Sequence, residues 1–89
     1  MNVVYGEYLN SPGYVYAWEL NKPLSLPHGS IIFVQSHKDG NNRALALVKE
    51  VSNVEESDIV DYGGRLPLPK VISALKVPNI KKQTYKFLD

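Results

Sequence analysis

Residues 3–20, VVYGEYLNSPGYVYAWEL, predict a β-hairpin, and this hairpin decides the fold class. Side chains in residues 3–9 alternate between two faces, as they do on a strand. Residues 14–20, YVYAWEL, are dominated by β-branched and aromatic side chains, which favour a strand over a helix. The NSPG segment at residues 10–13 is typical of a turn, because proline presets its backbone angle and glycine accepts a positive φ.

Three aromatic rings, those of Tyr14, Tyr16 and Trp18, share one face of the second predicted strand. They could form a stacking platform for nucleic-acid bases, or they could fill the inside of a small barrel. We favour the second interpretation, because a small barrel needs bulky apolar side chains and these rings are the largest in the chain. For base stacking, the better candidates are Tyr14, beside the turn, and Tyr85, near the end of the chain.

A second hairpin is predicted over residues 31–51. The apolar run IIFVQS at residues 31–36 is followed by HKDGNN, whose Asp-Gly pair is typical of a tight hairpin turn. Residues 43–51, RALALVKEV, would suit a helix in isolation, but the turn signal before them favours a partner strand.

The remaining segments are less regular. Two prolines and a glycine in residues 21–30 exclude a helix or a central strand there. Residues 52–69 are predicted to form a long irregular loop, in which a short helical turn fits VEESDIV at residues 54–60. Residues 70–77, KVISALKV, fit either a helix or a strand. We favour a strand, because a fifth strand would cover an exposed sheet edge.

The predicted fold class is therefore all-β, with a small five-stranded antiparallel barrel of the OB-like or SH3-like kind. The 89 residues suffice for a single domain. We expect its body at about residues 3–77 and a basic C-terminal tail at residues 78–89.

Three segments in order carry a resemblance to a known family: YVYAW at residues 14–18, LPHGSIIFVQS at 26–36 and RALALVKEV at 43–51. Over residues 3–51 the chain resembles the amino-terminal DNA-binding domain of the primosomal replication-restart helicase, and small phage proteins built on that plan. The resemblance implies a β-barrel, and in the helicase that domain captures the 3′ end of a DNA strand at a fork. Ser30 stands where this pattern usually has an acid, and no binding residue of the family is carried over.

The composition argues against an enzyme and against a bound metal or cofactor. The chain has no cysteine, so it has neither a disulfide nor a thiolate nucleophile. His28 and His37 are not at metal-ligand spacing, and the nearby serines do not match a nucleophile motif. No segment has the pattern of a secretory signal or a membrane span, so a cytoplasmic protein is expected, in the host cytoplasm if the chain is phage-encoded.

The charges are unevenly distributed although the net charge is only +1. Residues 50–61 carry acids without a base, and residues 70–86 carry lysines without an acid. Such an asymmetry is typical of two faces or two interaction surfaces.

Two functions from different classes follow. The preferred prediction is a protein-interaction module that binds a host or phage replication or regulatory protein. Its candidate contacts are four acids, Glu55, Glu56, Asp58 and Asp61. The alternative is a barrel that binds single-stranded or fork nucleic acid through phosphate-neutralising bases and stacking rings. Its candidate contacts are Tyr14, Lys38, Arg43, Arg65, Lys81, Lys82, Tyr85 and Lys86. A homo-oligomer formed through the C-terminal segment is compatible with either function.

Overall fold

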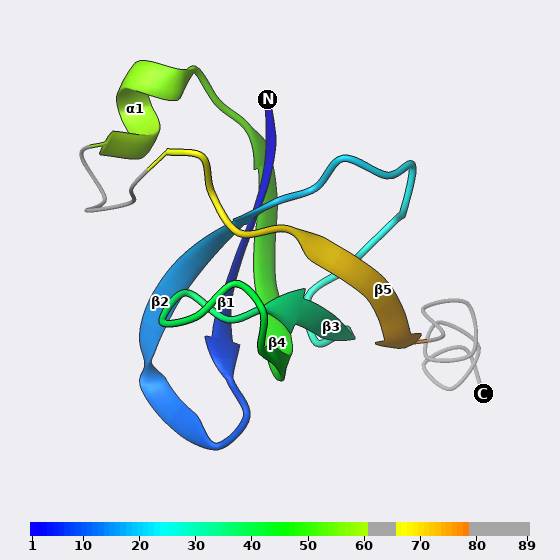
Figure 1. Cartoon of the computed structure of the whole chain (residues 1–89). Coiled ribbons are helices and arrows are strands. Elements are labelled where there is room, and N and C mark those ends of the chain that lie inside the picture. The colour runs from blue at the N-terminus through cyan, green and yellow to red at the C-terminus, as the bar shows by residue number, and fades with distance from the viewer. Residues whose placement is uncertain (61–65, 79–89) are drawn as a thin grey trace, which may run out of the picture.

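The computed structural model describes residues 1–60 and 66–78 and shows a mainly-β domain (Figure 1). Its elements are β1 (Asn2–Tyr8), β2 (Ser11–Glu19), β3 (Ile31–Gln35), β4 (Arg43–Asn53), α1 (Glu56–Val60) and β5 (Val71–Lys76). The strands form one antiparallel sheet in the order β2-β1-β4-β3-β5. The predicted five-stranded antiparallel sheet is confirmed, and so is the strand interpretation of the segment after Pro69.

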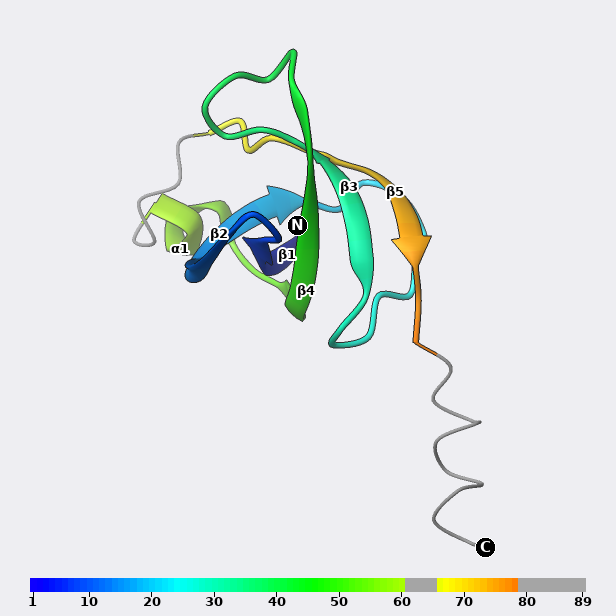
Figure 2. The same cartoon turned by 90° about the horizontal axis from the view of Figure 1, so that it is seen from below.

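The strand ladders do not close this sheet into a barrel. β2 and β5 are its two edges, and among the described residues a single parallel bridge between Glu19 and Lys70 links them. The Glu19 amide donates to the Pro69 carbonyl at 2.9 Å. The sheet is therefore strongly curled, so that the segment before β5 returns to the end of β2 (Figures 1 and 2).

The first hairpin forms, but its turn is not at residues 10–13. Tyr8 pairs with Ser11, so the reversal occurs at Leu9 and Asn10, and Pro12 lies within β2. β2 tolerates this proline because it is an edge strand. Gly13 has a φ of 105° and belongs to the irregular part of the β1–β2 ladder, where the register shifts. The positive φ inferred for this glycine is present, but it shapes a strand rather than a turn.

The prediction of an irregular loop over residues 52–69 is wrong at the start of this segment. β4 continues to Asn53, because its pairing with β1 extends to the Asn2–Asn53 pair. The short helical turn is confirmed as α1.

No helix among the described residues is long and apolar enough to cross a membrane.

The core has two parts, one on each face of the sheet. The larger part surrounds the fully buried Trp18 and Ile32, and the loop at residues 21–30 contributes Leu26 to it. The smaller part lies on the other face, where Ile59 of α1 and Leu68 cover Val3 and Ala17. The core interpretation of the aromatic strand is thus confirmed for Trp18, whereas Tyr14 is exposed.

Candidate functional site

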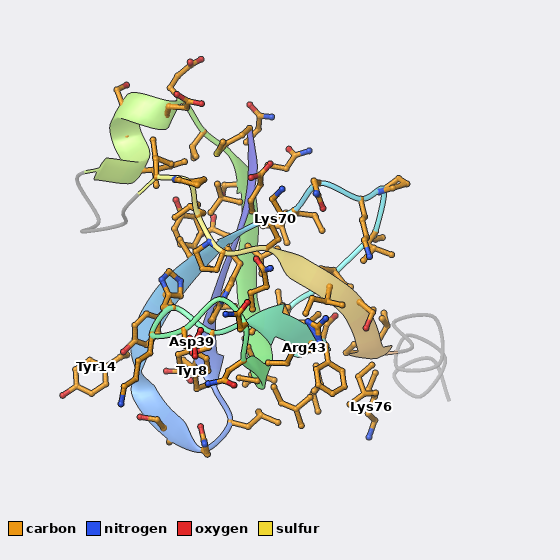
Figure 3. The ribbon with its side chains drawn as sticks, viewed as in Figure 1. Tyr8, Tyr14, Asp39, Arg43, Lys70 and Lys76 are labelled. Atoms are coloured by element: carbon orange, nitrogen blue, oxygen red, sulfur yellow. The ribbon has the colours of Figure 1, made fainter. Side chains whose placement is uncertain are left out.

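The three rings on β2 pass from the core to the solvent. Trp18 is completely buried, Tyr16 is half-buried and packs against the core, and Tyr14 is 69% exposed. In Figure 3 the Tyr14 side chain projects beyond the edge of β2. The Tyr16 and Trp18 rings lie 6.2 Å apart between centroids, and Tyr14 stands two positions before Tyr16 on β2. We call these three rings the ring row, which has a buried end at Trp18 and an open end at Tyr14.

Two rings from other elements extend this row. Tyr8, at the end of β1, lies 5.0 Å from Tyr16 and 5.3 Å from Trp18, measured between ring centroids. His37, just after β3, lies 5.2 Å from Tyr16 and 5.3 Å from Trp18. These separations and tilts are typical of favourable aromatic pairs. The half-buried Tyr16 is therefore held in place by two neighbouring rings.

Hydrogen bonds fix His37 in this cluster. Its backbone amide donates to the Tyr8 hydroxyl at 2.9 Å, and its ring Nε2 lies 2.6 Å from the Ala17 carbonyl oxygen. A carbonyl only accepts, so Nε2 must carry the hydrogen. Burial lowers the pKa of His37, and the bond to Ala17 opposes this shift only in part. The ring is thus a neutral donor to the backbone of β2 at physiological pH.

A hollow of about 490 Å³ opens beside these rings. Tyr8 and Tyr16 line its aromatic side, and the remainder is lined by Asn10, Ser11, Ser36, His37, Lys38 and Ala44. The β1–β2 turn and the β3–β4 hairpin reach the same end of the sheet, because Tyr8 pairs with Ala46 near the start of β4. This tertiary arrangement creates the site, which we call the aromatic groove. Its volume lies within the range of small-ligand sites.

Among the residues that line the aromatic groove, Lys38 is the charged one. Lys38 is exposed at its edge, and the exposed Arg43 begins β4 at the same end of the sheet. The hairpin also contains Asp39, but both of its carboxylate oxygens accept hydrogen bonds within the hairpin. Oδ1 accepts from the Asn41 amide at 3.0 Å and Oδ2 from Asn42 Nδ2 at 3.2 Å. The Asp39 carboxylate therefore stabilises the turn.

The predicted contact residues separate into three groups. Tyr14, Lys38 and Arg43 come to the groove end of the sheet, although neither Tyr14 nor Arg43 lines the hollow itself. Glu55, Glu56 and Asp58 are exposed at and before α1, near the opposite end of the sheet (Figure 1). The others lie outside the described residues: Asp61, Arg65, Lys81, Lys82, Tyr85 and Lys86.

Sequence reasoning missed Tyr8 and His37 as site residues. Tyr8 could have been predicted from the sequence, since it is the last inward-facing position of the first strand and lies beside the aromatic strand in any hairpin. His37 could not have been predicted as a site residue from the sequence, because only the folded hairpin brings it against β2. The described residues contain no group of three or more His, Cys, Asp or Glu side chains that could hold a metal ion.

No protein-family model matches the chain, and searches for similar curated proteins and similar solved structures found none.

Proposed function

We propose that the chain binds single-stranded nucleic acid in the aromatic groove. Bases would stack on the exposed part of Tyr16 inside the groove and on Tyr14 just outside it, while Lys38 neutralises a phosphate. The observation that carries this proposal is the row of rings that leaves the core and ends in the 69%-exposed Tyr14, next to a lysine-edged hollow. Stacking rings beside basic side chains are the combination that sequence-tolerant single-strand binders use.

The packing of the rings supports the proposal energetically. Tyr16 is fixed by Tyr8 and His37, so a base that stacks on it would immobilise little additional side chain. Tyr14 contributes little to the core, so its exposed ring is available to a ligand. Stacking of one base on one ring contributes about 1–3 kcal/mol to the free energy of binding.

We further propose that the curled sheet acts as a barrel of the OB-like or SH3-like kind, with the groove at its mouth. The Glu19–Lys70 bridge, which joins the two edges, supports this view. The sequence resemblance of residues 3–51 to the helicase DNA-binding domain is the reason why we propose DNA as the ligand.

Anisotropy of a fluorescent single-stranded oligonucleotide tests the proposal. At about 20 mM salt the wild-type chain should bind, and binding should weaken steeply as salt is added. Tyr14→Ala should lower the affinity about 5- to 150-fold, the equivalent of one lost stacking contact. Val15→Ala is the matched control, because Val15 is its neighbour on β2 and is 60% exposed, but faces the other side.

Two results would contradict the proposal. The first is the absence of wild-type binding even at about 20 mM salt, where screening is weak. The second is binding that Tyr14→Ala and Val15→Ala reduce equally, since that would show that the ring row does not contact the bases.

A second candidate function is a protein-interaction module that binds a basic partner. The supporting observation is that Glu55, Glu56 and Asp58 are exposed together, while the buried Ile59 anchors α1 to the sheet. Within the described residues none of these acids forms an ion pair. Long-range attraction between opposite charges would steer such a partner to α1.

A pull-down from the native host tests this candidate. Reversal of Glu55, Glu56 and Asp58 to lysine should remove a partner. The control is Glu50→Lys, which reverses an exposed acid on β4 instead. A partner list that the triple reversal leaves unchanged would eliminate the α1 acids as the contact.

A further inference from the structure

A second hollow shares Ser36 and His37 with the aromatic groove. It measures about 340 Å³ and is lined by Gln35, Gly40, Pro67, Pro69 and Lys70 as well as by Ser36 and His37. Ser36 and His37 also line the aromatic groove, so the two hollows meet at these residues. We call this second hollow the proline groove.

Hydrogen bonds hold the backbone of Lys70 in place in the wall of the proline groove. The Lys70 amide donates to Gln35 Oε1 at 2.9 Å, and its carbonyl accepts from the Gln35 amide at 2.9 Å. The Gln35 carbonyl in turn accepts from Trp18 Nε1 at 2.9 Å. The backbone that presents Lys70 is thus tied to the same tryptophan that begins the ring row.

The two hollows are bordered by lysines that are not neutralised. Lys38 lines the aromatic groove and Lys70 lines the proline groove, and both are exposed. Within residues 1–60 and 66–78 neither lysine forms an ion pair. Two cations, one beside each of two adjoining hollows, suit a ligand that carries several negative charges along its length, such as a phosphodiester backbone.

We propose that a bound single strand continues from the aromatic groove past His37 into the proline groove, where Lys70 binds a phosphate. This inference rests on the proposed nucleic-acid-binding function and extends it to a footprint of more than one hollow. Pro67 and Pro69 offer apolar surfaces to the sugars and bases, and Lys38 binds a phosphate on the near side of His37. The footprint thereby crosses the point where the segment before β5 meets β2.

Lys70→Gln tests this path, with Lys76→Gln as the matched control. Both lysines are exposed, and Figure 3 shows them at opposite ends of β5. Lys70 holds the fold through its backbone, so the glutamine variant should keep the wild-type melting temperature. Anisotropy with an oligothymidylate of about 12 nucleotides, within the site sizes of single-strand binders, provides the affinity.

We expect Lys70→Gln to lower the affinity about two- to fivefold at low salt. The slope of log K against log salt should fall by roughly 0.7, the value for one phosphate contact to a single strand. Lys76→Gln should change neither quantity.

The outcomes separate this inference from the function on which it rests. A wild-type chain that binds no oligonucleotide overturns both. Wild-type binding that responds to Tyr14→Ala, together with equal affinities and salt slopes for Lys70→Gln and Lys76→Gln, overturns the path through the proline groove alone.

Discussion

Gly6 is the residue at which one added methyl group should disturb the sheet most. It lies in β1 between Tyr16 of β2 and Val48 of β4, and the register shifts next to it on both sides. A Cβ atom at Gly6 would lie 2.5 Å from the Leu47 carbonyl oxygen and 3.5 Å from Trp18 Cζ3. The first contact is with backbone, so no side-chain rotation can relieve it. Gly6→Ala must therefore push β4 away from β1.

The loss of stability caused by Gly6→Ala can be estimated from the effect of overpacking in other protein cores. Forcing extra volume into a packed site costs about 1–3 kcal/mol, and a clash with backbone belongs at the upper end, about 2–3 kcal/mol. A chain of 89 residues has a free energy of unfolding of roughly 4–13 kcal/mol. In a domain of this size each kcal/mol shifts the melting temperature by about 4–8 °C. We expect Gly6→Ala to lower the melting temperature by roughly 10–20 °C.

Thermal and urea unfolding, followed by circular dichroism, provide the measurement. Gly40→Ala is the control, because a Cβ there meets nothing within 4 Å and its φ is not in the left-handed region. This control should be neutral or stabilise by up to about 1 kcal/mol, since alanine restricts the unfolded chain. A Gly6→Ala variant as stable as Gly40→Ala would refute the close approach of β1 and β4 at this point.

Three further variants test other parts of the structure. Trp18→Phe removes both volume from the core and the indole donor to the Gln35 carbonyl, so urea unfolding should show a loss of about 2 kcal/mol. Gly13→Ala has open space around its Cβ but a φ of 105°, and this strain should cost roughly 1–2 kcal/mol in the same assay. Burial lowers the pKa of His37 below its ordinary value of 6.5, so the unfolded chain takes up the proton first as the pH falls below 6.5. The free energy of unfolding should decrease from that pH down to the folded-state pKa and then level off; this decrease should be smaller in His37→Gln and should persist in His28→Gln.

Much of the candidate site could not be predicted from the sequence. Tyr14 was identified as the exposed ring because it lies at the open end of an alternating strand, which is a local property. Lys38 and Arg43 were predicted because they flank the predicted hairpin turn, and of the two Lys38 lines the groove. Lys70 and His37 were not, because their positions depend on contacts between segments far apart in the chain.

The sequence by itself determined the strands of both hairpins, the loop at residues 21–30 and the short helical turn. These features depend on side-chain alternation and on backbone preferences that act over a few residues. The tertiary structure alone decided that β1 lies beside β4 and that the segment before β5 returns to β2. It also decided where the β1–β2 turn occurs, since the pairing of Tyr8 with Ser11 left Pro12 and Gly13 within a strand. The physical reason is that register between distant strands is set by which faces are buried together, and no local preference contains that information.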